Sequence, residues 1–128
     1  MAKILTLKKR KDFLRVAAQF CIVTHNMVLQ AAHSLSETDA VWVGYTTTRK
    51  IGNAVRRNKC RRRLRAIVHE ILTELAFPHV DYVFIARKST ADCDFAELKK
   101  DTIYAIKKIN KNFSSVDSSN STSDNSSM

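Results

Sequence analysis

Apolar and polar residues alternate along the chain at two spacings, one typical of helices and one typical of strands. Residues 7–18 follow a helical spacing with one apolar side, so they predict a short helix. Short apolar runs predict two strands at 20–24 and 27–33, joined by a turn. β-Branched and aromatic residues predict two further strands at 40–48 and 80–86.

A long helix is predicted between the last two strands, at about 53–75. At about 100° per residue, its apolar residues fall within one arc, as wide as a core-facing stripe. The stripe consists of Cys60, Leu64, Ile67, Val68, Ile71 and Leu75. Pro78 ends this helix. A final helix with its own apolar stripe is predicted at about 94–111.

The predicted order of elements, α-β-β-β-α-β-α, indicates an α+β domain with one mostly antiparallel sheet and helices packed on it. The 128 residues suit a single domain, and 45% of them are hydrophobic, which is enough for a core. We expect the folded domain at residues 1–113. Residues 114–128 include eight serines and almost no apolar side chain, so a disordered tail is predicted there.

Positive charge is concentrated in two segments of the chain. The formal net charge is +10, and nine of the 22 Lys and Arg residues lie within 49–65. Six more lie among the first fifteen residues. A basic stripe of this density is typical of a nucleic-acid-binding protein. A basic amphipathic segment that lies on a membrane surface is the main alternative.

Membrane spans and disulfides are not indicated by the sequence. No run approaches the roughly 20 apolar residues that cross a bilayer, and the N-terminus lacks the apolar stretch of a signal peptide. The three cysteines are odd in number and widely spaced, so they do not suggest a disulfide framework. We therefore expect a cytoplasmic protein with reduced thiols.

The charge of the long helix stops at residue 65, although its apolar stripe continues. No acidic residue occurs between Asp39 and Glu70, so ion pairs one turn apart cannot neutralise this charge. Cations near a helix N-terminus are also disfavoured by the macrodipole. The arrangement therefore costs stability, and contact with phosphate is its natural explanation, since arginine binds phosphate through two parallel hydrogen bonds. Asn58 could reach a base edge or a sugar hydroxyl, or could bond water alone.

Residues for chemistry in the protein itself are not indicated. His69-Glu70 begins like a zinc-binding HExxH motif but lacks the second histidine. No paired carboxylates lie near the basic segment to hold two metal ions, as a protein nuclease would need. Cys60 lies among cations that could lower its pKa, yet a buried thiol on the apolar stripe is the interpretation we favour.

A family resemblance is carried by the segment TRKIGNAVRRNKCRRRLR, at residues 48–65. It resembles the signature of the protein subunit of bacterial ribonuclease P, in which an Arg-Asn pair and spaced basic residues follow Gly-Asn-Ala-Val. Other segments are similar to further parts of that family, in the right order: LKKRKDFLRVA, NMVLQA, VWVGYTTTRK and DYVFIARKSTADCDFAELKKD. The resemblance covers about residues 5–110.

The resemblance implies a fold and a function. The family fold is a two-layer α/β sandwich with a left-handed β-α-β crossover, as in related ribosomal-protein domains, which is an exception to the right-handed rule. The family assists a catalytic RNA that removes the 5′ leader of precursor tRNA. The implied partners are that RNA and precursor tRNA, with no obligate protein partner and no membrane. The implied cofactor is Mg²⁺, bound mainly by the RNA subunit and the substrate.

The resemblance also implies two groups of site residues. The expected RNA-binding residues are Arg49, Lys50, Asn53, Arg56, Arg57, Asn58, Arg61, Arg62 and Arg65. The 5′ leader is expected in a cleft between the first helix and the sheet, lined by Phe13 and Gln30. Some family members have aromatic residues at the position of Gln30, so base stacking is weaker here. Trp42 or Tyr45 could replace that platform, although each fits the core better.

Three alternative functions share some of these features. A ribosomal or other structural RNA-binding protein would have the same fold and charge and would co-sediment with ribosomal subunits. A DNA-binding regulator would place the basic helix in a major groove and prefer a duplex sequence. A protein-only nuclease would cleave without an RNA partner, and the carboxylates for that are missing.

Overall fold

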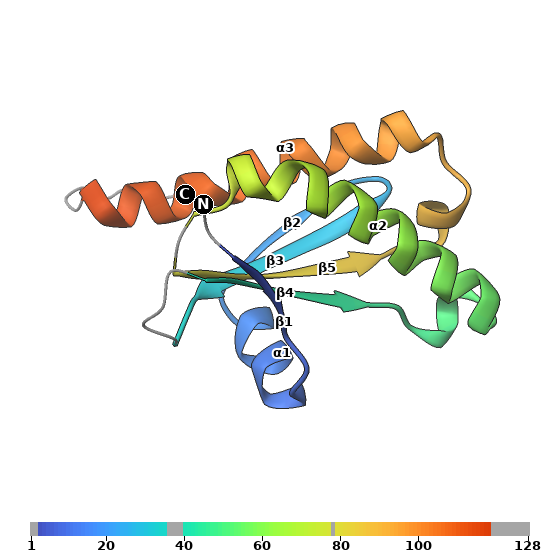
Figure 1. The fold of residues 1–128 in the computed structure, drawn as a ribbon, viewed down its shortest axis with the longest axis horizontal. Coiled ribbons are helices and arrows are strands. Elements are labelled where there is room, and N and C mark those ends of the chain that lie inside the picture. Colours follow the sequence, from blue (N-terminus) through green and yellow to red (C-terminus); the bar gives the residue numbers. More distant parts are fainter. Residues whose placement is uncertain (1–2, 36–39, 78, 119–128) are drawn as a thin grey trace.

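The computed structural model describes residues 3–35, 40–77 and 79–118, with the side chains described up to residue 113. Five strands form one sheet, and three α-helices and two short 3-10 helices complete the described chain (Figure 1). The strands are β1 (Ile4–Thr6), β2 (Phe20–Val23), β3 (Met27–His33), β4 (Val41–Thr46) and β5 (Val80–Ala86). The helices are α1 (Arg10–Ala17), η1 (Arg49–Ile51), α2 (Ala54–Leu75), η2 (Lys88–Ala91) and α3 (Phe95–Ser118).

The sheet is mixed, with the strand order β1-β4-β5-β3-β2. The pairs β2–β3 and β3–β5 are antiparallel, whereas β4–β5 and β1–β4 are parallel. The expectation of a mostly antiparallel sheet is therefore only half right. The sequence pattern did not predict β1, because a strand of three residues is too short to show alternation. Its pairing with β4 adds the second parallel contact.

The connection from β4 through α2 to β5 is a left-handed crossover (Figure 1). Both strands point the same way in this view, α2 lies above the sheet, and the chain returns to the strand behind β4. Most crossovers between parallel strands are right-handed, because that hand matches the twist of the strands. The handedness implied by the family resemblance is thus confirmed.

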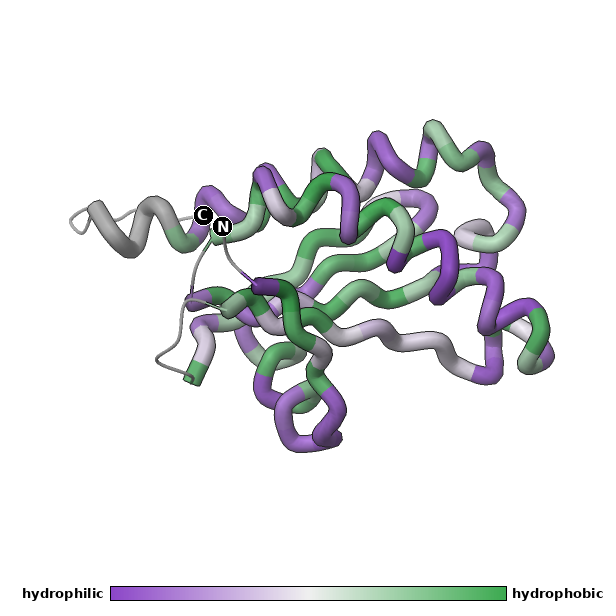
Figure 2. The backbone as a smooth tube through the Cα atoms, in the orientation of Figure 1, coloured by the Kyte–Doolittle hydropathy of each residue, from purple (hydrophilic) through white to green (hydrophobic). Residues whose placement is uncertain are grey.

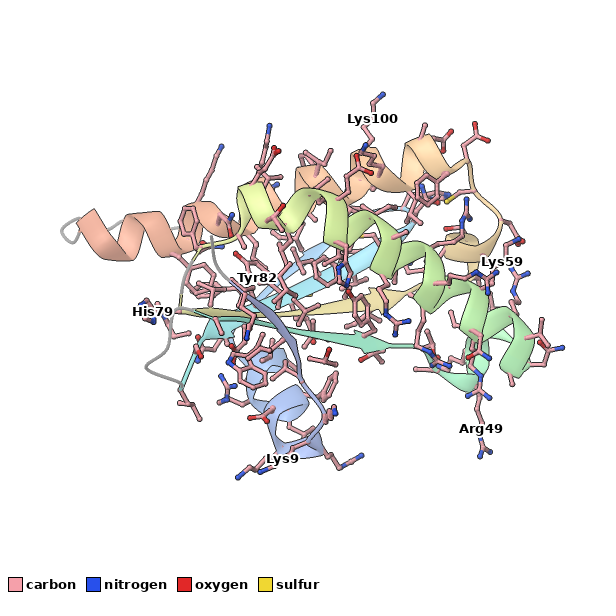
Figure 3. All side chains as sticks on the ribbon, in the orientation of Figure 1. Lys9, Arg49, Lys59, His79, Tyr82 and Lys100 are labelled. Carbon is pink, nitrogen blue, oxygen red and sulfur yellow. The ribbon has the colours of Figure 1, made fainter. Side chains whose placement is uncertain are left out.

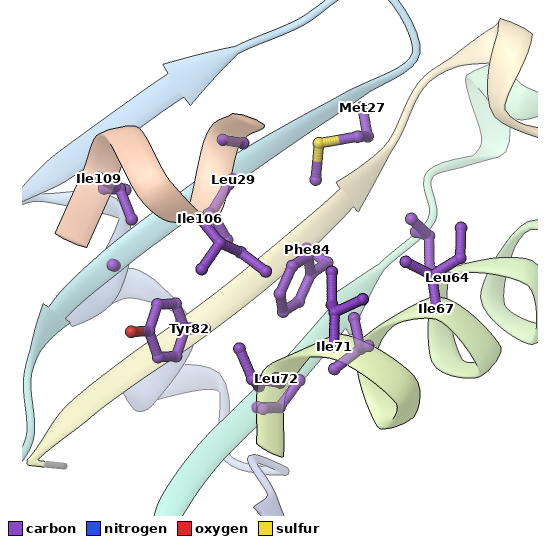
Figure 4. Close-up of a cluster of buried hydrophobic side chains, with 14 of the residues drawn as sticks. Met27, Leu29, Leu64, Ile67, Ile71, Leu72, Tyr82, Phe84, Ile106 and Ile109 are labelled. Carbon is purple, nitrogen blue, oxygen red and sulfur yellow. The ribbon is translucent and has the colours of Figure 1, made fainter. Parts of the chain in front are cut away.

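The larger core lies under α2 and α3, which cover the same face of the sheet (Figure 1). Hydrophobic residues line most of the strands and the inner sides of these helices, whereas the first turn of α1 is hydrophilic (Figure 2). The apolar stripe predicted for α2 is confirmed, and Leu72 adds to it. Its members Leu64, Ile67 and Ile71 pack with Phe84 of β5 and Ile106 of α3 (Figure 4).

A smaller core lies on the opposite face, where α1 is the only helix of the described chain (Figure 1). Val16 of α1 is fully buried with Ala32 of β3 and Val83 of β5. Phe13 and Trp42 pack against this cluster and remain half-buried. A helix of eight residues covers only part of a five-stranded sheet, so much of this face is left open.

The last helix is longer than predicted. Phe113 is buried between α3 and the sheet, and its ring contacts the rings of Phe20 and His33, with centroids 5.0 and 4.8 Å away. This anchor holds α3 past the expected end at residue 111, and the helix continues to Ser118. The helix therefore takes in the first part of the predicted tail, and residues 119–128 lie outside the described residues.

Candidate nucleic-acid interface

The start of α2 has the turn and cap that the sequence predicts. The Asn53 side chain accepts a hydrogen bond from the backbone N–H of Arg56 at 3.0 Å, which satisfies one of the free donors of the first turn. Gly52 has a φ of 142°, and a Cβ atom there would lie 2.7 Å from Cδ of Arg56. Only glycine fits this backbone without strain. The turn fixes the direction in which the basic helix leaves the sheet.

Arg56 ties the beginning of α2 to the segment after β5. Its Nε donates to the carbonyl of Ile51 at 3.0 Å, and its Nη2 donates to the carbonyl of Lys88 at 3.0 Å. Both terminal nitrogens also bond the carboxylate of Asp92, through Nη1 at 3.1 Å and through Nη2. The hydrogen bond from Arg56 lowers the pKa of Asp92. Most donors of this guanidinium therefore serve the fold.

Arg63 makes a second set of contacts about two turns further along the same side of α2. Its two terminal nitrogens donate to the carbonyls of Thr90 and Cys93, each at 2.6 Å. Its Cζ also lies 5.7 Å from the centre of the Phe95 ring, a cation–π distance. Together Arg56 and Arg63 fasten the charged half of α2 to η2 and to the start of α3.

The other arginines of the signature lie on a different side of α2. Arg57, Arg61 and Arg65 are spaced four residues apart, so they follow one another along one side of the helix. Asn58 and Arg62 extend this side. With Arg49 and Lys50 of η1 they make up a surface that we name the basic face, which consists of Arg49, Lys50, Arg57, Asn58, Arg61, Arg62 and Arg65. Arg49 projects away from the body of the molecule at this end (Figure 3).

Internal contacts preorganise part of the basic face. Arg61 donates to Thr47 Oγ1 at 2.6 Å through Nη1 and to the side-chain oxygen of Asn58 through Nη2. These bonds orient the Asn58 amide so that its NH₂ group is free to donate outward. The guanidinium of Arg65 lies 5.5 Å from the centre of the Tyr45 ring. Arg62 is exposed.

Phe13 and Gln30, the two residues expected to contact the leader, lie on the face of the sheet that carries α1. Phe13 packs on Gly44 of β4, where a Cβ atom would lie 2.6 Å from the ring carbon Cε1. Gln30 lies on β3, paired with Cys21 and Val83, and is half-buried. The structure therefore places both residues on one face, and glycine at position 44 makes room for the aromatic ring.

The two candidate aromatic platforms lie on opposite faces. Trp42 faces α1 and packs with the smaller core, so it is on the same face of the sheet as Phe13 and Gln30. Tyr45 faces α2 and packs against the larger core. Burial raises the pKa of Tyr45 to about 12, despite the nearby charge of Arg65. Tyr45 therefore cannot replace the missing aromatic in a cleft beside α1.

Groups with catalytic potential are sparse in the described structure. Cys60 is completely buried, and this burial raises its pKa, so the thiol is not activated by its cationic neighbours. Among the described residues, no three His, Cys, Asp or Glu side chains come together in a way that could hold a metal ion. None of the helices in this part of the chain combines the length and hydropathy that a membrane crossing requires.

The sequence did not indicate which arginines of α2 bind groups within the protein and which remain on its surface. Arg56 was expected to bind RNA, and the structure gives most of its donors to Ile51, Lys88 and Asp92. The contact of Arg63 with Thr90 joins residues 27 positions apart in the chain. The position of a basic residue around a helix does not indicate whether its side chain faces solvent or binds a carbonyl from a distant part of the chain.

These features define a class: a small mixed α+β protein with a left-handed crossover and a basic helix fastened at one end of its sheet. A family model described as Ribonuclease P matches residues 1–110. The ribonuclease P protein component of Paramagnetospirillum magneticum is 39% identical over 112 residues, which cover 84% of each chain. That of Gluconacetobacter diazotrophicus is 41% identical over 103 residues, covering 80% of this chain and 88% of the relative.

A solved structure agrees with these relatives. The RNase P protein from Thermotoga maritima is 25% identical, with a TM-score of 0.69 over 80% of this chain and 96% of that one. The chain therefore belongs to the ribonuclease P protein family. It is a protein component of a ribonucleoprotein endonuclease in which the RNA subunit is catalytic.

Proposed function

We propose that this protein binds the catalytic RNA through the basic face and holds the 5′ leader of precursor tRNA on the open sheet surface beside α1. The proposed binding of the catalytic RNA rests on one observation, which is that the arginines of α2 divide into two groups. Arg56 and Arg63 hold the helix to the protein, while Arg62 and Arg65 remain exposed on the basic face. A helix fixed in this way presents its cations to phosphate without further ordering of the backbone.

The proposed RNA contact is electrostatic in origin. Each phosphate that the basic face neutralises releases counterions, so affinity should fall steeply as salt rises. The protein would also reduce the repulsion between the catalytic RNA and its substrate, which otherwise requires a high concentration of Mg²⁺. We propose that Mg²⁺ is bound mainly by the RNA subunit and the substrate, as the family resemblance implies.

The proposed leader contact rests on the open part of the α1 face. Beyond the reach of α1, the residues of this face are half-buried or exposed: Cys21, Val23, Val28, Gln30, Thr46 and Ile85. Phe13 stands at the edge of this area, with its ring held against Gly44. A ring in that position can stack on an unpaired base, and Gln30 can donate to or accept from it.

Reconstitution tests the function as a whole. The purified protein is mixed with the catalytic RNA and a precursor tRNA at low Mg²⁺, and release of the 5′ leader is measured. We expect cleavage only when protein and RNA are both present, with protein alone and RNA alone as controls. Tight binding to ribosomal RNA without stimulation of cleavage would instead favour a structural RNA-binding protein.

The neighbouring residues Arg62 and Arg63 provide a matched pair of variants. We expect Arg62→Ala to weaken assembly with the RNA and to lower the slope of log affinity against log salt by about one, with no loss of stability. Arg63→Ala should leave that slope nearly unchanged and lower the thermal midpoint of the free protein. An unchanged slope for Arg62→Ala would remove this residue from the RNA interface.

A further inference from the structure

A pocket of about 770 Å³ lies on the side of α1 that faces β1, and neither Phe13 nor Gln30 lines it. We infer that this pocket binds a single unpaired nucleotide of an RNA strand, with the base over Trp42 and Asp81 and the phosphate at the lysines around the start of α1. The inference goes beyond the proposed function, because it concerns a different surface from the basic face and from the leader side of α1.

Three buried polar atoms of the pocket lining have no hydrogen-bond partner within the described residues: the donors Nε of Arg15 and Nε1 of Trp42, and the acceptor Oδ1 of Asp81. Trp42 and Asp81 are paired across β4 and β5, so their side chains lie next to each other on the α1 face. Asp81 is 2% exposed, and its buried Oδ1 meets no hydrogen-bond donor within the described residues. The buried indole Nε1 of Trp42 likewise meets no acceptor there. Buried polar groups are nearly always bonded, so this pair calls for a polar ligand.

Arg15 holds the carboxylate of Asp81 in this position. Its Nη2 donates to Asp81 Oδ2 at 2.6 Å, and its Nη1 donates to the carbonyl of His33 at 2.9 Å. Asp12 lies 3.5 Å from the same guanidinium. Arg15 therefore balances the charge of Asp81 and leaves its buried Oδ1 without a donor.

The chemistry of the walls matches a nucleotide. The pairing edge of a nucleobase carries an N–H group next to an acceptor, which complements a carboxylate oxygen next to an indole N–H. Leu5, Leu7 and Leu35 give the pocket apolar walls for a flat ring. The rim carries Lys8, Lys9 and Lys11, which are exposed, and Lys9 points away from the sheet (Figure 3). These cations suit the phosphate that every nucleotide of RNA carries.

Trp42 is the single tryptophan of the chain, so its indole N–H gives one resonance in a ¹⁵N–¹H spectrum. The full-length protein is titrated with each of the four nucleoside monophosphates at constant ionic strength, with ribose 5-phosphate and the free nucleosides as controls. We expect a saturable downfield shift of the indole resonance with the monophosphates. Nucleosides should bind about tenfold more weakly, and ribose 5-phosphate should leave the resonance in place.

Two variants separate this site from adventitious binding. Asp81→Asn keeps an oxygen for Arg15 and puts an NH₂ group where Oδ1 stood, so we expect about tenfold weaker binding of the monophosphates. The triple variant Lys8→Ala, Lys9→Ala, Lys11→Ala should weaken the monophosphates and not the nucleosides, which keeps the inference testable if Asp81→Asn does not fold. Lys100→Ala, on α3 at the far side of the molecule, is the matched charge control and should bind normally (Figure 3).

The outcomes that overturn the inference are distinct from a failure of the proposed function, because the titration uses no catalytic RNA and no cleavage assay. An indole resonance that does not move at saturating nucleotide would mean that the pocket holds only water. The response would follow charge alone if ribose 5-phosphate shifted the indole resonance as much as the monophosphates do. The same would hold if Lys100→Ala and the triple variant lost equal affinity for the monophosphates.

Discussion

The two faces of the sheet are built from the same strands and differ in what covers them. On β5, Tyr82 and Phe84 face α2 and α3 and are completely buried among apolar side chains. The residues on either side of this pair, Asp81 and Ile85, face α1, where one is an ion-paired carboxylate and the other is half-buried. A face covered by two long helices can be uniformly apolar, whereas a face covered by one short helix keeps polar groups and open surface for ligands.

The largest expected effect concerns the covered face. Leu64 is fully buried between α2 and the sheet, so we expect Leu64→Ala to lower the free energy of unfolding by about 2–5 kcal/mol. Leu14→Ala on α1 is the control, because Leu14 is 59% exposed and should change stability by less than about 0.5 kcal/mol. Urea denaturation followed by circular dichroism measures both. Similar losses for the two variants would contradict the contrast between the faces.

A second effect should come from the contact of Phe13 with Gly44. A methyl group at position 44 would lie 2.6 Å from the ring, so Gly44→Ala should cost about 1–3 kcal/mol of stability. Because the clash involves one side chain, the double variant Gly44→Ala, Phe13→Ala should lose less than the sum of the single variants. If the stability losses of the two single variants add up to that of the double variant in the same denaturation experiment, the ring does not press on Gly44.

The sequence was sufficient to predict those parts of the fold that follow from the local spacing of apolar residues. The apolar stripe of α2 repeats over about four turns, so its burial could be predicted from Cys60 to Leu75. The three-residue strand β1 and the tie from Arg63 to Thr90 depend on contacts between distant parts of the chain, which periodicity does not report. The unpartnered Oδ1 of Asp81 also depends on a distant contact, because Arg15, 66 positions away, binds the other oxygen of the carboxylate.

A third effect concerns the open face and substrate binding. We expect Phe13→Ala to reduce affinity for a precursor tRNA with a long leader by about 1–2 kcal/mol, the loss of one stacked base. Affinity for leaderless tRNA should not change, because the basic face is intact. Affinities are measured with the assembled ribonucleoprotein at one salt concentration. Equal losses on both substrates would assign Phe13 to the core alone.

The smallest expected effect is an increase in affinity for the long-leader substrate. Gln30 lies on the same face as Phe13, and the family resemblance implies an aromatic residue at this position in some members. Because Gln30 is half-buried at an open part of the sheet, a larger ring can extend over the surface without displacing the core. We expect Gln30→Tyr to tighten binding of the long-leader substrate by about 1 kcal/mol or less, with leaderless tRNA unaffected. If affinity falls instead, Gln30 contributes through hydrogen bonds that tyrosine cannot replace, and the leader is read on this face by polar groups rather than by stacking.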